Sequence, residues 1–416
     1  MKVGLEAIAF DIPKFYVDMT ELAHYRSIDP AKFTKGLGQL EMSVASPCED
    51  TVTLAAGAAI KLMHGFNIDK ESIGLCVVGT ETPIDQSKPI ASHIHEILGL
   101  PKNCRVFETK HACYGATAAL AMATDWILSG RAQGKKAIII ASDIARYGLK
   151  TAGEPTQGAG AVAMLISDNP KLLELETNYV GNYSEQVMDF WRPTYSKEAF
   201  ADGHFSIQCY LTALAGSYDA YRESFTKQHA DAPEMLASRF AACLYHVPFV
   251  KMANKAHHKL IEHETKTKIE KDDPRMNDVI KDFNERVAGN LNLNARIGNV
   301  YTGSLYLSLF NFLEQNSAKN VGRAISLFSY GSGCTSEFFS GIVQPGAELA
   351  LQKVSSQSAL NSRIRIPVDH YEKMLNASAE SDQNNVEVSD PKTWHITGPV
   401  LYLGNKDHKR QYAVNQ

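Results

Sequence analysis

Apolar, β-rich runs alternate with helical patterns through the first half of the chain, and this alternation restricts the fold more than any other feature. The runs typical of buried strands are LCVVGT (75–80), KAIIIASD (136–143) and GAVAMLIS (160–167). The helical patterns are TVTLAAGAAIKLM (51–63), IASHIHEIL (90–98) and the stretch after Cys113. Such an alternation predicts a parallel or mixed sheet that is covered by helices on both faces.

The same order of elements returns after residue 290. GNVYTGSLYLSLFNFLE reads as a glycine-rich turn followed by a helix, and AISLFSYGSG reads as the strand after it. A chain of 416 residues is also too long for one ordinary core. We therefore predict a duplicated α/β fold with halves at 1–170 and 171–416, the second carrying a helical insertion at about 207–290.

Composition excludes several classes of function. The net charge of −4 argues against nucleic acid as a partner, because such binding needs a basic surface. No run approaches the roughly 20 apolar residues of a membrane span, and the N-terminus lacks the pattern of a signal peptide. We expect a soluble, cytoplasmic protein without a membrane partner. The polar segment 376–391 is expected to be a surface loop or to lack order.

The seven cysteines form no CxxC pair, and an odd number does not suit a disulfide framework. HIHEILGL lacks the second histidine of a zinc-binding HExxH motif. GAGAVAMLI leads into a β-rich run instead of a helix, which argues against a dinucleotide fingerprint. We expect reduced thiols and no metal.

Cys113 stands in KHACYGATAALAMATDWI, directly before a stretch typical of a buried helix. Free N–H groups at a helix start would lower the pKa of a thiol and favour the thiolate nucleophile. Equally, free cysteine is among the most buried residue types and is often inert. The stretch alone leaves both interpretations open.

Two further residues could exchange protons. Glu81 directly follows a buried strand in VVGTETPIDQSKP, where partial burial would raise the pKa of its carboxyl group. A surface or helix-capping glutamate is the alternative. His246, in LYHVPFVKMANKAHHK, could act as a neutral hydrogen-bond donor or an acid/base, or could be a satisfied core histidine.

Lys251, Lys255 and Lys259 recur every four residues and so share one helical face. This stripe either holds the phosphates of a substrate or is a solvated face. In FSYGSGCTSEFF, glycines flank Ser332 and let backbone N–H groups approach a substrate oxygen. A thiol, a carboxylate and a histidine in these settings suggest acyl-thioester chemistry that forms carbon–carbon bonds.

At these residues the chain resembles the 3-hydroxy-3-methylglutaryl-CoA (HMG-CoA) synthases of the thiolase superfamily. The similar stretches include GTETPIDQSK, ACYGATAAL, DFWRP, YHVPFVKM, GNVYTGSLYLSL and LFSYGSG, and they extend from about residue 3 to about 345. The resemblance implies a five-layered αβαβα fold built from two duplicated halves. It further implies a homodimer that uses acetyl-CoA and acetoacetyl-CoA and needs no metal or redox cofactor.

The resemblance also implies roles for individual residues. Cys113 resembles the acetyl-accepting nucleophile, Glu81 the acid/base that forms the acetyl enolate, and His246 the residue that polarises the acetoacetyl ketone. The positions similar to ligand contacts are Asp29, Thr156, Ser206, Lys251, Lys255, Asn299 and Ser332. The positions similar to supporting active-site residues are Tyr114, Asp143, Tyr147 and Asp189. The backbone N–H groups of Cys113 and Ser332 would be the oxyanion donors.

Two other functions remain open. A relative that installs β-branches on polyketides, acting on acyl carrier proteins, would carry the same catalytic trio. We favour free CoA because DFWRP, HVPFVKM and NVYTGSLYL resemble the primary-metabolism branch and the lysine stripe suits a nucleotide phosphate. An inactive acyl-CoA-binding homologue is the alternative from another class, and the intact trio argues against it.

Overall fold

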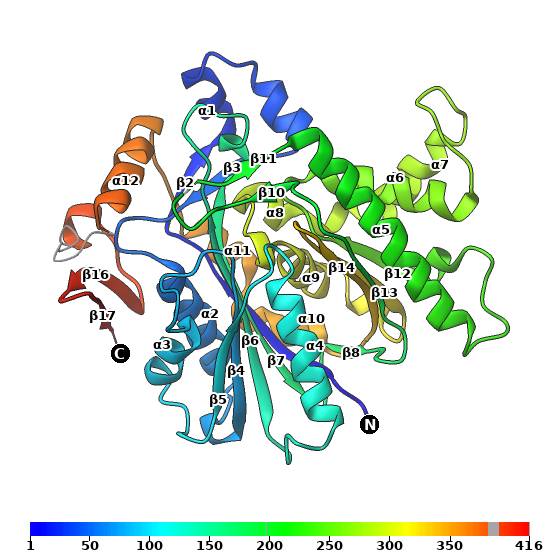
Figure 1. The fold of residues 1–416 in the computed structure, drawn as a ribbon, viewed down its shortest axis with the longest axis horizontal. Helices are drawn as coiled ribbons and strands as arrows, with labels where there is room; N and C mark the ends of the chain where they lie inside the picture. The colour runs from blue at the N-terminus through cyan, green and yellow to red at the C-terminus, as the bar shows by residue number, and fades with distance from the viewer. Residues whose placement is uncertain (197, 382–390, 416) are drawn as a thin grey trace.

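The computed structural model describes residues 1–416 except 197, 382–390 and 416, and is organised around one ten-stranded sheet (Figure 1). The strand order is β12-β13-β14-β8-β1-β7-β6-β4-β5, with β9 paired to β14. The strands are β1 Gly4–Asp11, β2 Phe15–Asp18, β3 Glu41–Val44, β4 Ile73–Gly79, β5 Arg105–Thr109, β6 Lys136–Ala145, β7 Gly158–Ser167, β8 Leu173–Leu175, β9 Gly181–Ser184, β10 Phe190–Trp191, β11 Phe200–Ala201, β12 Phe240–Tyr245, β13 Ala324–Gly331, β14 Thr335–Val343, β15 Ile364–Arg365, β16 Val400–Lys406 and β17 Lys409–Val414.

Helices pack against both faces of the sheet. They are α1 Met19–Tyr25, α2 Thr51–Gly65, α3 Ile90–Ile97, α4 Gly115–Leu128, α5 Gly203–Thr226, α6 Lys251–Thr265, α7 Met276–Arg286, α8 Asn292–Ile297, α9 Ser304–Gln315, α10 Ala347–Leu351, α11 Ser356–Asn361 and α12 Val368–Ser381. Short one-turn helices include the π-helix Lys32–Leu37 and the 3₁₀-helix Tyr301–Gly303.

Three hydrophobic clusters define five layers. The central cluster packs α4 and α9 between the sheet region β1-β7-β6-β4 and the region β12-β13-β14. Alternate residues of the first region face α2 and α3, while those of the second region face α5 and α6. The order from one side to the other is therefore helix, sheet, helix, sheet, helix.

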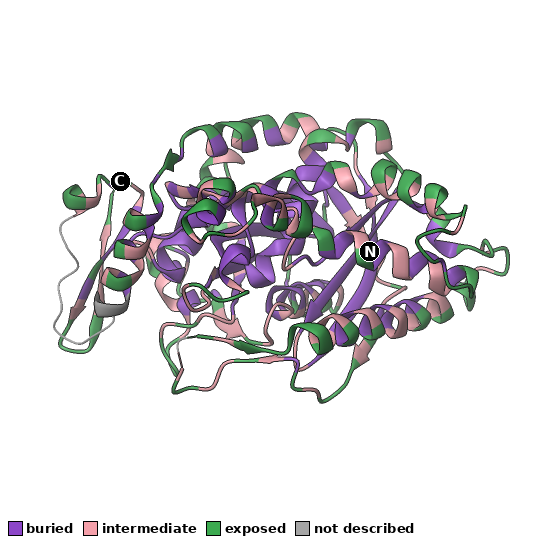
Figure 2. Ribbon diagram, turned by 90° about the horizontal axis from the view of Figure 1, so that it is seen from above, coloured by how far each residue is buried: buried purple, intermediate pink, exposed green. Residues whose placement is uncertain are grey.

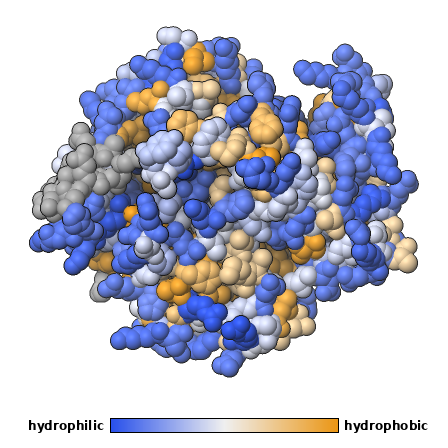
Figure 3. Space-filling view, viewed as in Figure 1, coloured by the Kyte–Doolittle hydropathy of each residue, from blue (hydrophilic) through white to orange (hydrophobic). Residues whose placement is uncertain are grey.

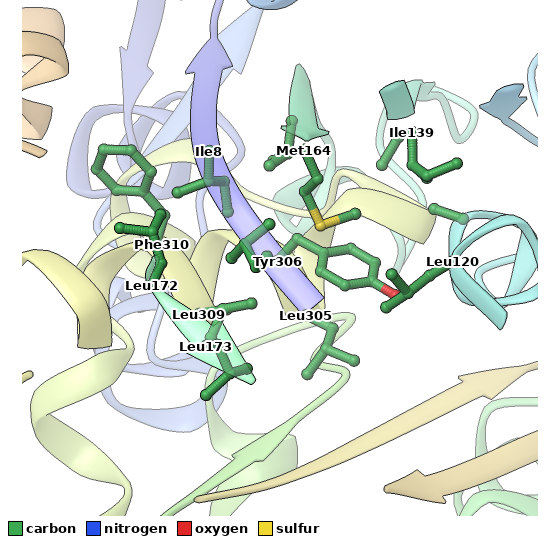
Figure 4. Packing of buried hydrophobic residues seen from close by; sticks show 14 of the residues in the cluster. Ile8, Leu120, Ile139, Met164, Leu172, Leu173, Leu305, Tyr306, Leu309 and Phe310 are labelled. Atoms are coloured by element: carbon green, nitrogen blue, oxygen red, sulfur yellow. The ribbon is translucent and has the colours of Figure 1, made fainter. Parts of the chain in front are cut away.

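Figure 4 shows the central cluster, where Ile8, Met164 and Phe310 converge from β1, β7 and α9. Figure 2 shows that buried residues occupy the middle of the molecule, with exposed residues along the outer helices. The two sheet regions are continuous because β8 pairs with both β1 and β14. This large shared interior explains how one chain sustains two sheet regions.

The elements predicted from the sequence are confirmed. The strands expected at 75–80, 136–143 and 160–167 are β4, β6 and β7, and the helices expected at 51–63, 90–98 and after Cys113 are α2, α3 and α4. The returning order after residue 290 is α9 followed by β13.

The predicted boundary near residue 170 falls between β7 and β8, and the stretch 207–290 holds most of α5, followed by β12, α6 and α7. The division into halves stays a prediction. Of the segment 376–391, the first residues continue α12, and 382–390 lie outside the described residues.

In the part of the chain that the structure describes, no helix is long and apolar enough to cross a membrane. Hydrophilic side chains prevail on the face shown in Figure 3, with apolar ones scattered among them. All seven cysteines are free thiols, and Cys334 is buried in the cluster around α5, where it packs among apolar side chains.

Candidate active site

The candidate catalytic residues follow the carboxyl ends of parallel strands. β4 is parallel to β5 and β6, and β12 is parallel to β13. Glu81 comes after β4, Cys113 lies between β5 and α4, and His246 comes directly after β12. Ligands of open α/β sheets bind at this end of the strands, because loops of several strands meet there.

Two glycines let these loops touch. A Cβ at Gly79, the last residue of β4, would lie 2.4 Å from the backbone nitrogen of Ala116. A Cβ at Gly331, which ends β13, would lie 2.8 Å from the backbone nitrogen of Tyr114. At both positions the backbone lies closer to the segment around Cys113 than any residue larger than glycine would allow.

The thiol of Cys113 faces the carboxylate of Glu81. Sγ lies 3.4 Å from Oε1, so the S–H donates to this oxygen. The side chain of Glu81 is only 6% exposed. Ala112, directly before the cysteine, has a φ of 40°, in the left-handed region that L residues avoid. Strain of this kind is found at functional turns that the surrounding structure holds in place.

The expected thiolate of Cys113 is corrected by the structure. Burial raises the pKa of the thiol well above its usual range, and the negative charges of Glu81 and Asp143 add to the rise. The helix start was predicted to lower this pKa, but desolvation and two carboxylates outweigh it. The cysteine is therefore a thiol in the resting site, and its reaction needs a base.

Glu81 carries the carboxyl group within reach of the thiol and is the candidate base. Burial raises the pKa of its carboxyl group, as predicted from its place after a strand, and the charge of Asp143 raises it further. The guanidinium of Arg192 and the S–H of Cys113 act in the opposite direction. A carboxyl group balanced in this way can take up and release a proton near neutral pH.

Asp143, near the end of β6, holds the loop that carries Glu81. Its Oδ1 accepts from the hydroxyls of Thr80 and Thr82 at 2.8 and 2.7 Å, and from the backbone N–H of Glu81 at 2.9 Å. Oδ2 accepts from the backbone N–H of Thr302 at 3.1 Å. Burial raises the pKa of Asp143, and these hydrogen bonds oppose the rise. A carboxylate with so many donors fixes the loop in one position.

His246 is held by its backbone and leaves its ring available. Its backbone N–H donates to Phe328 O at 2.7 Å, and its carbonyl accepts from the Tyr210 hydroxyl at 2.8 Å. Burial lowers the pKa of the imidazole to about 3, so the ring is neutral at pH 7. Among the described residues, its buried Nδ1 has no hydrogen-bond partner. Such atoms are rare in protein interiors and are typical of ligand sites.

Asn299 and Thr156 lie side by side. The backbone N–H of Asn299 donates to Thr156 O at 3.0 Å. Its side-chain Oδ1 accepts from the backbone of Tyr301 at 2.9 Å and from the Ser304 hydroxyl at 3.0 Å. The ring of Tyr147 packs edge-to-face on that of Tyr301, with 6.4 Å between centroids. This group reaches Asp143 through Thr302, the next residue of the same turn.

Asp189 anchors the turn that contains Ser332. Its Oδ1 accepts from the backbone N–H of Gly333 at 2.9 Å, and its Oδ2 accepts from the Tyr330 hydroxyl at 2.6 Å. The hydroxyl of Ser206, near the start of α5, lies 3.5 Å from Oδ2. Asp189 is fully buried, and Ser332 beside it is half-buried.

Tyr114, directly after Cys113, is hydrogen-bonded to the second sheet region. Its hydroxyl donates to Oε2 of Glu337 on β14 at 2.7 Å. Burial raises the pKa of Glu337 to about 7. Tyr114 therefore ties the start of α4 to the second sheet region.

The candidates for CoA contact lie on the surface. Asp29, Lys251 and Lys255 are all exposed. The start of α6, which carries the lysines, packs against the segment that follows the π-helix: the N–H of Val250 donates to Oε1 of Gln39 at 3.2 Å. The lysines and the Asp29 segment therefore border the same edge of the molecule.

Several residues of the site carry no role in the sequence-based prediction. Arg192 lies 3.5 Å from Oε2 of Glu81, and its guanidinium stands over the ring of Tyr301 at 5.6 Å. Thr80, Thr82 and Glu337 are the others. Arg192 stands in the DFWRP stretch that carries the resemblance, which was its only signal. Within the described residues, no three His, Cys, Asp or Glu side chains cluster as metal ligands.

Family models assign the chain. The model for the hydroxymethylglutaryl-coenzyme A synthase N terminal matches residues 1–171, and that for the C terminal matches residues 173–283 and 264–415. The chain belongs to the hydroxymethylglutaryl-CoA synthase family. The resemblance inferred from the quoted stretches is thereby confirmed.

Known members of the family are similar over nearly the whole chain. The hydroxymethylglutaryl-CoA synthase of Enterococcus faecalis is 37% identical, covering 92% of this chain and 94% of that protein. The polyketide biosynthesis 3-hydroxy-3-methylglutaryl-ACP synthase of Bacillus subtilis is 34% identical, covering 91% and 89%. A solved structure of MvaS in complex with 3-hydroxy-3-methylglutaryl coenzyme A has a TM-score of 0.92 at 43% identity, covering 100% and 99% of the two chains. The thiolase-like, five-layered fold is confirmed by this likeness.

Proposed function

We propose that this chain condenses acetyl-CoA with acetoacetyl-CoA and water to give HMG-CoA and CoA through an acetyl-Cys113 intermediate. The contact between the Cys113 thiol and the Glu81 carboxylate, at 3.4 Å, carries the proposal. A thiol and a carboxylate suited to act as nucleophile and base meet there, and relatives of the chain are named for synthesis of this product.

The first step acylates the enzyme. Glu81 takes the proton of the thiol while the sulfur attacks the carbonyl carbon of acetyl-CoA. The C–S bond to CoA then breaks, and the leaving thiolate takes that proton to give free CoA. The backbone N–H groups of Cys113 and Ser332 are our candidates for stabilising the oxyanion of this step.

The second step forms the carbon–carbon bond. Glu81 removes a proton from the methyl carbon of acetyl-Cys113, and the enolate carbon attacks the ketone of acetoacetyl-CoA. The neutral ring of His246 donates a hydrogen bond to the ketone oxygen, and this oxygen becomes a hydroxyl by taking up the proton that Glu81 removed from the methyl carbon. Asn299 is a second candidate for holding the acetoacetyl group.

Hydrolysis completes the cycle. Water attacks the thioester carbonyl on Cys113, the C–S bond breaks, and the product leaves with a free carboxyl group while the thiol is restored. HMG-CoA is then available to the mevalonate route to isoprenoids. The reaction needs no change of oxidation state, which accords with our prediction that the enzyme uses no redox cofactor.

The remaining parts of the proposal concern partners and location. We expect Lys251 and Lys255, with Asp29 near them, to contact CoA. Edge strand β5 pairs with β4 on one side, and its other side offers a surface for a homodimer. Free cysteines accord with a reducing compartment such as the cytoplasm.

Action on acyl carrier proteins is the second candidate, because the 34% identical relative from Bacillus subtilis is a 3-hydroxy-3-methylglutaryl-ACP synthase. The catalytic trio is compatible with either carrier. The exposed lysines at the start of α6 suit the phosphates of free CoA, and for this reason we favour CoA.

The deciding assay follows the loss of acetoacetyl-CoA absorbance by the purified protein, with and without acetyl-CoA, alongside Cys113→Ala. A loss that requires acetyl-CoA and disappears in the variant is the expected result. Activity that appears only when acyl carrier proteins replace CoA would instead support the polyketide function. Full function of Cys113→Ser in a cell would refute the catalytic role altogether.

A further inference from the structure

The carboxylate of Glu81 has a different partner on each oxygen. Oε1 accepts from the thiol of Cys113, and Oε2 lies 3.5 Å from a guanidinium nitrogen of Arg192. The side chains of Glu81 and Arg192 are 6% and 18% exposed, so solvent screens this ion pair little. The cation is therefore strongly coupled to the charge of the candidate base.

Arg192 is itself held in place from two directions. Its guanidinium stands over the ring of Tyr301, whose centroid is 5.6 Å away. Three residues earlier in the chain, the buried Asp189 is fastened to the β13–β14 turn through Gly333 and Tyr330. The segment from Asp189 to Arg192 is therefore fixed to the second sheet region at Asp189 and reaches Glu81 in the first sheet region at Arg192.

The charged and titratable groups around Glu81 come from five other segments. Cys113 and Asp143 face it from the start of α4 and from β6, and Tyr147 and Tyr301 interact with it from the loop after β6 and the 3₁₀-helix. Burial raises the pKa of both tyrosines, so they stay neutral at ordinary pH. Arg192 is the cation among these groups.

We propose that Arg192 is a positioning residue that stabilises the ionised form of Glu81 and aims Oε1 at the thiol by pairing with Oε2. The inference rests on the proposed function, because it assigns to Glu81 the role of base. Without the guanidinium, burial and Asp143 would act on Glu81 with the hydrogen bond from Cys113 left to oppose them. The carboxyl group would then stay protonated to higher pH, and the fraction of enzyme with a working base would fall at neutral pH.

The experiment compares pH–rate profiles of wild type, Arg192→Gln and Arg192→Lys for condensation of acetyl-CoA with acetoacetyl-CoA. The acid limb of kcat should move up by at least about one pH unit in Arg192→Gln, since an opposite charge at this distance lowers a carboxyl pKa by about 1–3 units. Arg192→Lys retains a cation and should move the limb by less than half as much.

A second readout needs no turnover. The rate at which iodoacetamide alkylates Cys113, followed by mass spectrometry of its peptide, should show the same upward shift in Arg192→Gln. If Arg192→Gln does not fold, Arg192→Met keeps the length of the side chain and replaces it in both assays. Arg275→Gln, which removes an exposed ion pair with Asp273 before α7, is the matched control and should leave both profiles in place.

Unchanged limb positions in the neutral variants, with kcat lowered equally at every pH, would overturn the proposal and assign Arg192 a merely structural role. Failure of the proposed function would be visible separately, as wild-type protein that consumes no acetoacetyl-CoA. The alkylation profiles would still decide the role of Arg192 in that case.

Discussion

Replacing Gly79 with alanine should separate the base from the nucleophile. The added Cβ would lie 2.4 Å from the nitrogen and 2.5 Å from the Cα of Ala116, and both are backbone atoms that cannot rotate aside. Ordinary contact needs about 3.5 Å, so the end of β4 and the start of α4 must part by about 1 Å. Overpacking of this kind costs about 3 kcal/mol of unfolding free energy where the neighbour is rigid.

The same displacement should lengthen the 3.4 Å contact between the Cys113 thiol and Glu81. A misplacement of about 1 Å can lower the rate about 100-fold. Urea denaturation and the acetyl-CoA-dependent loss of acetoacetyl-CoA would measure the two effects.

Gly203→Ala is the matched control for this substitution. Gly203 begins α5, and a Cβ there meets no atom within 4 Å, so stability should stay the same or rise by about 0.5 kcal/mol. If Gly79→Ala kept the stability and the rate of the wild type, the close packing of β4 on α4 that this reasoning assumes would be refuted.

Three further substitutions test the site. Asp143→Asn should lower the unfolding free energy by about 3 kcal/mol and kcat at least about 10-fold, because an amide cannot accept from all the donors that hold the Glu81 loop. A variant with the unfolding free energy and kcat of the wild type would contradict this. Glu337→Gln should remove a pH-dependent loss of stability. Burial raises the pKa of Glu337 from 4.5 to about 7, so the folded state binds the proton more tightly than the unfolded state. The wild type should therefore lose about 3 kcal/mol of unfolding free energy as pH rises through this interval, which denaturation at pH 4.5 and 8 would measure. Equal pH dependence in both proteins would contradict the reasoning. Lys251→Ala and Lys255→Ala should each raise the KM for acetoacetyl-CoA about fivefold at low salt with little change in kcat, whereas unaltered KM values would remove these lysines from the CoA site.

The order of strands and helices could be predicted because each signal is local. The apolar runs around Val77 and Ile139 specify buried strands whatever surrounds them, and the alanines after Cys113 specify a buried helix. Reactive residues directly after such runs were natural candidates, since the ends of parallel strands gather at one edge of the sheet.

Electrostatic properties of the site could not be predicted in this way. The helix start next to Cys113 indicated a lowered thiol pKa, but the tertiary structure buries the thiol beside Glu81 and Asp143 and reverses the direction. A pKa depends on every charge and on the burial that the folded chain imposes, and these come from distant segments. The same reason hid Glu337, which meets Tyr114 across more than 200 residues.

The sequence by itself determined the elements, their alternation and the identity of the groups that can react, because local hydrophobic pattern and side-chain chemistry need no partner. Only the tertiary structure decided which oxygen of Glu81 faces the thiol and which faces Arg192. That division depends on Gly79 and Gly331 letting backbones meet, and on Asp189 fastening the Arg192 segment to another sheet region. Contacts between residues so far apart in the sequence form only when the five layers pack together.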